Sequence, residues 1–433
     1  MTTTTKKSNL FYGILSMPAT AMGFALCVQI AALSWILNTK YGLNIEEIGK
    51  VWLAGPLAGI LGQLIAGAVS DQVWLWGGRR RPFIIIGGTI AGLMILALPY
   101  LDVIQAGMGL ESLVGVALTV ALTLDLAINI SFNPARSIIA DVTEEGEART
   151  KGFTWMQTIS GFFGVLAYLM GAFINNYFLI YFGAAFVLLT AVVPAFFIEE
   201  PRELTKAAVA EGRQTTSTDW WAFLKICGAH AFTWVGVQTM FIYSFAYIKE
   251  VIMGFETAAE LTTEQNNEIG FSIGVAFAIL NTVGFILPSQ VLEPLARKWG
   301  RVRTHTLAIA VMAVGYGLLV LFGSSMTSFF VLMAIIGIGW GSVVSLPFAI
   351  MSEVVDQSRM GMMMGIFNLS VVLPQVVASG LGSFIESQAD KTVIFIISAV
   401  ALAISAGLWF LVKEQNKGAE VAETALTDAG GHH

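Results

Sequence analysis

Long apolar runs recur along this chain of 433 residues, and they constrain its fold more than any other feature. A bilayer core about 30 Å thick is crossed by roughly 20 apolar residues in an α-helix. Lipid leaves the backbone no outside hydrogen-bond partner, and runs this long and continuous are helices rather than barrel strands. We therefore predict an all-α integral membrane protein with twelve transmembrane helices, at residues 10–37, 48–70, 83–101, 112–140, 153–175, 177–198, 220–248, 268–295, 304–323, 327–352, 361–386 and 392–412.

The composition excludes several other classes of protein. Hydrophobic residues make up 56% of the chain and charged residues 12%, whereas soluble proteins carry about 25% charged residues. A net charge of −6 with scattered basic residues argues against nucleic-acid binding. Cys27 and Cys227 both lie in apolar stretches, which predicts neither a disulfide framework nor a metal site. The first apolar run is too long for the core of a cleaved signal peptide.

Lysine and arginine predict the orientation in the membrane, because basic residues gather in cytoplasmic loops. With both termini on one side, that side holds eighteen of the 23 basic residues and the other side holds four, Lys40, Lys50, Lys249 and Lys391. Arg136, near the end of the fourth span, is the remaining one. We expect both termini in the cytoplasm of a multi-pass protein of the cell's inner (plasma) membrane.

The segments and loops divide the chain into two matching halves. We predict an N-terminal six-helix half at residues 1–198, a cytoplasmic linker at 199–219, a C-terminal six-helix half at 220–412 and a cytoplasmic tail at 413–433 whose last residues resemble a tag remnant. Carboxylates and arginines follow the second and fourth spans, and similar groups follow the eighth and tenth. Such matching is typical of repeats about an axis along the membrane normal.

These loops are interpreted in two ways. The simpler one is positive-inside charge plus helix caps. The paired spacing favours a cytoplasmic gate, in which Asp71 or Glu293 forms an ion pair with arginines of a neighbouring helix. This ion pair must break when the protein opens inward. The predicted gate residues are Asp71, Arg79, Arg80, Arg81, Asp141, Arg149, Glu293, Arg301, Glu353 and Arg359.

Three stretches carry a resemblance to a known family. They are residues 52–84, with Gly78-Arg-Arg-Arg-Pro-Phe-Ile84; residues 125–141, with Asn133-Pro-Ala-Arg136; and residues 365–375, with Asn368 and Pro374-Gln375. They resemble the plant sucrose transporters and their bacterial and animal relatives, in the glycoside–pentoside–hexuronide branch of the major facilitator superfamily. The resemblance covers essentially all twelve spans and implies a proton-coupled sugar symporter. The region after the seventh span departs from the plant pattern, so we expect a different sugar-binding surface in the C-terminal half.

Asp125 is the first candidate for proton coupling. It lies near the middle of an apolar span, where a carboxylate costs about 2.5–3.5 kcal/mol and marks an ion or substrate pathway. Burial disfavours the charged form of a carboxyl group, so such a group can gain and lose a proton. The alternative is permanent pairing with a buried base. The resemblance implies the proton site, since a matching aspartate in the plant transporters is the proposed one.

Arg136 follows Asp125 by eleven residues, about three helical turns and about 16 Å, too far for direct pairing on a straight helix. Pro134 permits a bend that shortens this distance. Three roles are open to Arg136: tuning the proton site, binding sugar hydroxyls, or pairing with Asp141 or Glu353 at the gate. The gate is our first choice.

Amides and aromatic rings in the spans are candidates for sugar binding, because planar amides bind pairs of hydroxyls and aromatic rings cover apolar sugar faces. Asn129 continues the polar stripe of Asp125. The predicted substrate-binding residues are Gln29, Asp125, Asn129, Gln157, Gln238, Asn281, Trp340 and Asn368. His230 and His305 are weaker candidates for proton relay, and we expect His305 in a loop.

The leading hypothesis is a monomeric secondary active transporter that carries a sugar such as sucrose or maltose together with protons, with no cofactor and with lipid as its only other contact. Sodium coupling or uncoupled transport is the alternative, although the first span has no carboxylate and the second only Glu47 near its edge. A sensor that binds sugar without transporting it is a third possibility. No phosphate-binding loop, nucleophile elbow or metal motif is present, so we predict that the protein is not an enzyme.

Overall fold

The computed structural model describes residues 8–59, 74–143, 147–200, 217–256, 261–356 and 360–414. Within these ranges the regular structure is helical, apart from one isolated bridge between Leu75 and Gly78. The all-α prediction is thereby confirmed for the described part of the chain.

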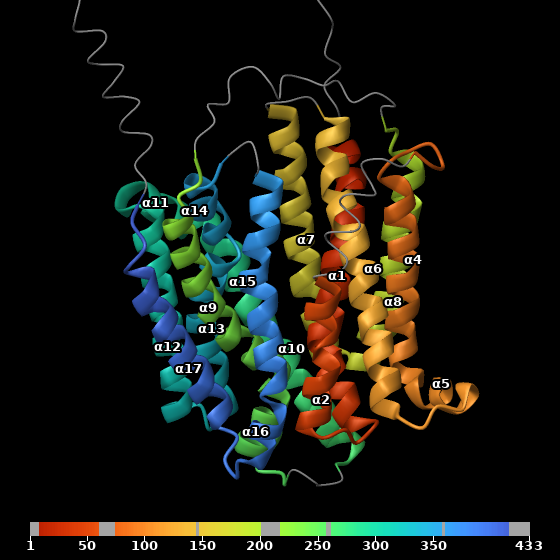
Figure 1. Cartoon of the computed structure of the whole chain (residues 1–433). Coiled ribbons are helices and arrows are strands. Elements are labelled where there is room, and N and C mark those ends of the chain that lie inside the picture. Colours follow the sequence, from red (N-terminus) through yellow and green to blue (C-terminus); the bar gives the residue numbers. More distant parts are fainter. Residues whose placement is uncertain are drawn as a thin grey trace, which may run out of the picture.

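The helices fall into two sequential sets (Figure 1). The first contains α1 (Asn9–Thr39), α2 (Ile45–Trp52), α4 (Arg81–Ala97), η1 (Leu98–Tyr100), α5 (Leu101–Met108), α6 (Leu113–Val142), α7 (Glu147–Phe173) and α8 (Asn176–Phe197). The second contains α9 (Trp220–Tyr247), η2 (Ile248–Ile252), α10 (Thr263–Leu287), η3 (Pro288–Leu292), α11 (Glu293–Trp299), α12 (Arg301–Phe322), α13 (Met326–Val343), α14 (Leu346–Val354), α15 (Met360–Gly380), α16 (Gly382–Ser387) and α17 (Val393–Trp409).

Ten segments among the described residues are long and apolar enough to cross a membrane, and α17 is a shorter apolar helix. The predicted second span, residues 48–70, begins in α2 and in the helical residues 54–59, and its remainder lies outside the described residues. The total of twelve spans therefore stays a prediction, while a multi-pass membrane protein is what the helices show.

Polar caps determine where several of these helices begin. The side chains of Ser8, Ser112, Asp219, Thr262 and Ser325 each accept a hydrogen bond from the backbone N–H three residues later, at 3.0–3.3 Å. Such caps satisfy N–H groups that have no partner inside the helix. Apolar sequence then extends the helix until the next polar loop.

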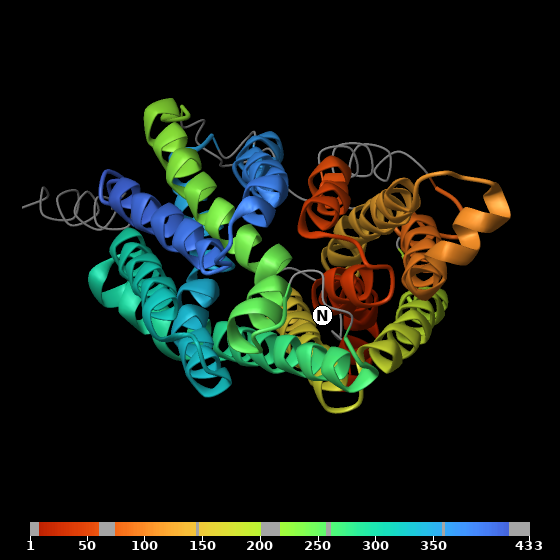
Figure 2. The same cartoon turned by 90° about the horizontal axis from the view of Figure 1, so that it is seen from below.

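The helices pack as two groups that lie side by side (Figure 2). Helices α1, α4, α6, α7 and α8 pack against one another, as do α9, α12, α13, α15 and α17 with α10. Contacts between α7 and α10 and between α2 and α16 join the groups. The last helix of the first group ends at Phe197 and the first helix of the second group begins at Trp220. We call the groups the N-half and the C-half.

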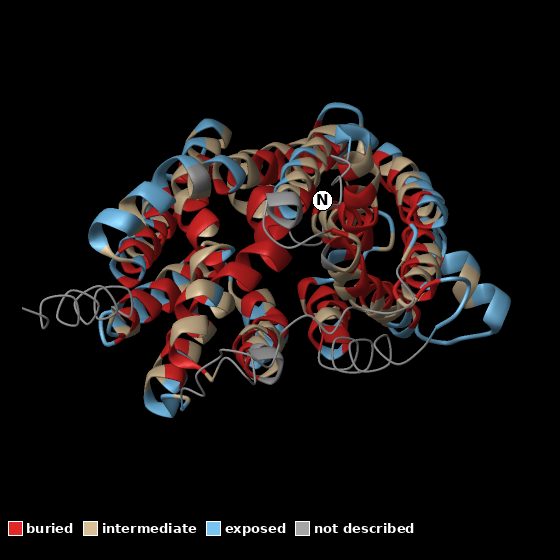
Figure 3. Ribbon diagram, turned by 90° about the horizontal axis from the view of Figure 1, so that it is seen from above, coloured by how far each residue is buried: buried red, intermediate tan, exposed pale blue. Residues whose placement is uncertain are grey.

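The described part of the chain begins with α1 and ends after α17 at the same end of the bundle, the upper end of Figure 1. We call this the terminal end; α5 and α16 lie at the opposite end. Buried residues face the interior and exposed residues lie mainly around the outside (Figure 3). Large apolar side chains such as Phe173 and Leu321, both 71% exposed, belong to that outer surface. An apolar outer surface is what contact with lipid requires.

Candidate functional site

A cavity of about 220 Å³ lies between the two halves, toward the terminal end. Helices α1, α6 and α7 of the N-half and α10 and α13 of the C-half supply its walls. The lining side chains are mixed: Arg136, Gln157, Ser160 and Asn281 are polar, and Phe132, Phe285 and Trp340 are aromatic. A few polar groups in an aromatic wall are typical of small-molecule sites.

Four residues predicted from the sequence line this cavity together. They are Arg136 from α6, Gln157 from α7, Asn281 from α10 and Trp340 from α13. Trp340 Nε1 donates to Asn281 Oδ1 at 3.2 Å, and Asn281 Nδ2 donates to the backbone oxygen of Phe277 at 2.9 Å. Asn281 and Trp340 therefore hold each other in place on the C-half wall, opposite the N-half residues.

Arg136 is in the cavity rather than in the predicted gate pairing. Its guanidinium carbon lies 3.9 Å from the centre of the Phe132 ring one turn earlier, a cation–π contact, and its side chain is exposed. Asp141 and Glu353, the two partners expected for it, instead bond to Arg80 and Arg301. The predicted pairing is wrong in this conformation, and Arg136 is free to meet a ligand with its hydrogen-bond donors.

Asp125 is buried on the same helix, seven residues before Phe132, and is 5% exposed. Gln29 Nε2 from α1 donates to Asp125 Oδ2 at 2.9 Å. Gly55 lies beside the same carboxyl group, since a Cβ placed there would be 3.7 Å from Oδ2. Among the described residues no lysine, arginine or histidine forms an ion pair with Asp125. The permanent pairing with a base that we considered is therefore not what these residues form.

The other predicted sugar-binding residues lie away from the cavity walls. Asn129 Nδ2 donates to the backbone oxygen of Asp125 at 2.8 Å. Gln238 is 6% exposed, and its Oε1 accepts from Gln375 Nε2 at 3.3 Å within the C-half. Asn368 is half-buried on α15. Gln29, Asp125, Asn129, Gln238 and Asn368 thus stay predictions as sugar ligands, whereas the cavity gathers Gln157, Asn281 and Trp340.

At the terminal end of the N-half, a carboxylate cluster holds the start of α4. Arg80 Nε donates to Asp141 Oδ2 of α6 at 3.1 Å, and both side chains are about nine-tenths buried, with 10% and 11% exposed. Glu200, three residues after α8, accepts the backbone N–H groups of Arg79, Arg80 and Arg81 at 2.8–2.9 Å. A carboxylate is favoured at a helix N-terminus, where N–H groups lack internal partners.

The C-half repeats this arrangement at the start of α12. Arg301 bonds to Glu353 of α14, with side chains 47% and 26% exposed. Glu414, beyond α17, accepts the backbone N–H groups of Arg301 and Val302 at 2.7 and 2.9 Å. Glu200 and Glu414 were missed in the sequence because each lies far along the chain from the helix it caps. The available signal was that each glutamate lies within a few residues of the end of the last helix of its half.

Some predicted gate residues are placed differently. Glu293 pairs with Arg297 of its own helix at 2.5 Å, so the predicted bridge from Glu293 to a neighbouring helix is wrong. Arg81 donates to the backbone oxygens of Trp76 and Ile198 at 3.0 and 2.5 Å. Asp71 and Arg359 lie outside the described residues, as does the side chain of Arg149.

The two histidines are core residues. His305 lies inside α12 with no exposure, and its Nδ1 is 2.7 Å from Ser342 Oγ, so the expected loop position is wrong. His230 Nε2 accepts from Trp234 Nε1 at 2.9 Å, and its ring stacks on Phe367. Neither histidine lines the cavity between the halves.

Curated relatives of this chain are named as sugar carriers. The sucrose transport protein SUC4 of Arabidopsis thaliana is 25% identical over 425 residues, which cover 80% of this chain and 79% of that protein. The sucrose transport protein SUT2 of Oryza sativa subsp. indica is 26% identical and covers 81% and 83%. The general alpha-glucoside permease of Schizosaccharomyces pombe is 24% identical over 58% of this chain and 54% of its own length. These relatives are transport proteins, which confirms that the chain is not an enzyme.

Solved structures and a family model agree on the fold. The nucleoside transporter NupG superposes with a TM-score of 0.67 at 13% identity, covering 94% of this chain and 99% of that one. A bacterial homologue of the human lysosomal transporter Spinster, in an inward-facing and occupied conformation, has a TM-score of 0.63 at 14% identity and covers 92% and 95%. The model of the Major Facilitator Superfamily matches residues 10–379 and 291–429. The chain belongs to the Major Facilitator Superfamily, as the motifs in its sequence led us to expect.

Proposed function

We propose that this protein carries a sugar, a glucoside or disaccharide such as sucrose or maltose, across the plasma membrane together with protons, by alternating access. The observation that supports this most is the buried Gln29–Asp125 pair, which lies on the two helices, α1 and α6, that also wall the cavity between the halves. The names of the curated relatives support a sugar as the substrate class.

The terminal end is the cytoplasmic end in this proposal. The basic residues of Arg79–Arg81, Arg297–Arg303 and Lys225 lie there, as cytoplasmic loops require. The cavity is lined by the last turns of α6, α10 and α13 and by the middle of α1 and α7, so it lies toward that end. The described conformation thus corresponds to a carrier open toward the cytoplasm.

The sugar binds between the halves in this mechanism, as in other carriers built from repeats. Gln157 and Asn281 face the cavity from opposite halves and offer planar amides to hydroxyl pairs, while Trp340 supplies an aromatic face. The volume of about 220 Å³ is below the about 300–1,000 Å³ typical of ligand pockets. The halves therefore rearrange around the sugar to enclose two rings.

Asp125 carries the proton. When it is protonated, the neutral carboxyl group accepts from Gln29 at little electrostatic cost in a dry bundle; when it is charged, burial penalises it. Closure around the sugar is then favoured only with the proton bound, and release of the proton to the cytoplasm accompanies release of the sugar. The first and fourth spans move together because Gln29 and Asp125 join them.

Uptake into proteoliposomes tests the proposal, with a panel of labelled disaccharides and monosaccharides and an imposed pH gradient, inside alkaline. We expect at least one glucoside to accumulate above its outside concentration, and a proton ionophore to abolish the accumulation. Equal uptake with and without the pH gradient would favour an uncoupled carrier, and dependence on a sodium gradient would favour sodium coupling. Binding without any flux would indicate a sensor.

A further inference from the structure

The two halves meet backbone to backbone at the opposite end, between α2 and the segment α15–α16. A Cβ on Gly49 of α2 would lie 2.5 Å from the carbonyl oxygen of Ser379, and one on Gly382 would lie 2.9 Å from Cα of Glu46. Only glycine permits such an approach, so these two positions let the halves come into direct contact. Two hydrogen bonds also join the halves at this end. Ser34 Oγ donates to the backbone oxygen of Ile242 at 3.0 Å, and Trp35 Nε1 donates to the backbone oxygen of Asn266 at 2.7 Å.

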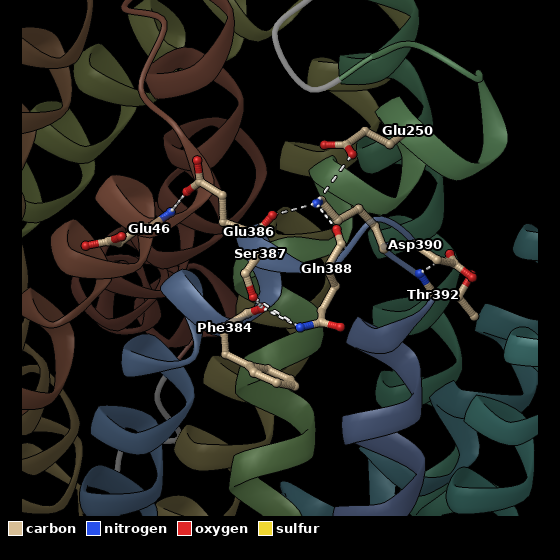
Figure 4. Close-up of polar contacts among 9 residues, drawn as sticks. Glu46, Glu250, Phe384, Glu386, Ser387, Gln388, Asp390 and Thr392 are labelled. Carbon is tan, nitrogen blue, oxygen red and sulfur yellow. Dashed lines mark hydrogen bonds and ion pairs between the residues drawn. The ribbon is translucent and has the colours of Figure 1, made fainter.

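The start of α2 is capped by both halves at once. Asn44 Oδ1, its own N-cap, accepts the N–H of Glu47 at 2.8 Å. Glu386 Oε2, from α16 of the other half, accepts the N–H of Glu46 at 2.8 Å (Figure 4). The first N–H groups of a helix have no partner inside it and attract negative charge. When the halves separate here, the Glu46 N–H loses its carboxylate and must find water.

Lys391 holds the end of α16 in the shape that presents Glu386. Its side chain is 2% exposed, and Nζ donates to the backbone oxygens of Glu386 and Gln388 at 3.1 and 2.6 Å. It also lies 3.7 Å from Glu250 Oε2, in the turn η2 after α9 (Figure 4). The ammonium group thereby satisfies carbonyls at the C-terminus of α16 and ties them to another helix of the same half.

We infer that Glu386 is the positioning residue of an outer latch: its carboxylate seals the sugar path from outside by capping α2 of the other half, and Lys391 keeps it aimed. The latch must open whenever the cavity faces outward. The inference rests on the proposed orientation, in which the opposite end is extracellular.

Cys27 offers a native reporter, because it lines the cavity between the halves. With Cys227 replaced by serine, a membrane-impermeant maleimide added to right-side-out or inside-out vesicles measures how often the cavity opens to each side. The variants are Glu386→Ala, which removes the cap, and Glu386→Gln, which keeps an acceptor oxygen. Gln388→Ala is the matched control, since among the described residues that side chain bonds only to Phe384 and Ser387 of its own segment.

We expect Glu386→Ala to raise the labelling rate of Cys27 from the outside about fivefold, the change in population that a lost helix cap produces, and to lower the rate from the cytoplasmic side. Glu386→Gln should restore most of the wild-type pattern, and Gln388→Ala should match the wild type. Equilibrium sugar binding should stay within about threefold in all variants, whereas a merely destabilised protein would label faster from both sides.

Unchanged outside labelling in Glu386→Ala overturns the latch, as does an equal effect of Gln388→Ala. If Glu386→Ala yields too little protein, Glu386→Gln and Lys391→Met take its place, and an unchanged ratio of outside to inside labelling in both contradicts the inference. The assay needs no sugar, so a failure to transport any sugar leaves it readable. If the membrane orientation is reversed, wild-type Cys27 labels faster from the outside, which separates that failure from a failure of the latch.

Discussion

The carboxyl group of Asp125 has a neutral amide as its partner, and this pairing leaves its charge uncompensated when it loses a proton. Gln29 donates to it at 2.9 Å, and no cation among the described residues neutralises it. In the proposed mechanism, each uptake of a proton changes the net charge of this buried site, and that change couples the proton to closure. An arginine in place of Gln29 would instead fix the charge and abolish the cycle.

Asp125→Asn should remove coupling and leave sugar exchange intact. Asparagine imitates the protonated carboxyl group permanently, so no proton is released at the cytoplasmic side. We expect no accumulation driven by a pH gradient, yet continued exchange of labelled for unlabelled sugar across the membrane. Accumulation by Asp125→Asn at the wild-type level would place the proton site on another residue.

Gln157→Ala should weaken sugar binding by about 1–3 kcal/mol, because a buried hydroxyl loses its partner. Thr158→Ala, the next residue of α7, is the control, since Thr158 lies outside the cavity wall. Titration of labelled sugar onto purified protein gives both dissociation constants. Equal affinities in the two variants would move the sugar away from this wall.

The positions of the helices were predictable, and most of the pairings between them were not. The length of the apolar runs located the described spans. Polar residues within spans are expected to face the interior of the bundle, and one cavity is indeed lined by Arg136, Gln157, Asn281 and Trp340. The rotation of each helix about its axis is set by packing, which a single sequence does not display. For this reason the Gln29–Asp125 bond and the burial of His305 emerged only from the structure.

At the scale of elements, each half has an arginine–carboxylate pair at its terminal end, and the two pairs differ in how far they are buried. The Arg80–Asp141 pair is about 10% exposed, whereas Arg301 and Glu353 are 47% and 26% exposed. A buried pair that loses one member leaves an uncompensated charge, which costs about 3–5 kcal/mol, while an exposed pair contributes about 0–1 kcal/mol. Loss of one member of the pair should therefore destabilise the N-half more than the C-half.

Arg80→Met should lower the unfolding temperature of the purified protein far more than Arg301→Met. The double variant Arg80→Met with Asp141→Leu should recover much of the loss, because it removes the stranded charge as well. Thermal unfolding in one detergent compares all three with the wild type. Similar losses for Arg80→Met and Arg301→Met would show that burial does not separate the two clusters.

Considered as a whole, the molecule has its two halves in contact at the opposite end and a cavity between them toward the terminal end. Glycine contacts and hydrogen bonds between the halves close the first, and the cavity lies near the second. In the proposed alternating access, a rocking of the two halves would exchange these two conditions.

The most direct test of this account follows protons rather than sugar. Proteoliposomes enclosing a pH-sensitive dye receive a transported sugar on the outside, with no initial pH gradient and with the membrane potential clamped. Proton-coupled transport through Asp125 predicts that the sugar acidifies the lumen of wild-type vesicles at a rate proportional to sugar uptake, and that Asp125→Asn abolishes the acidification while exchange continues. Sugar uptake without any change of lumenal pH in the wild type would contradict the account.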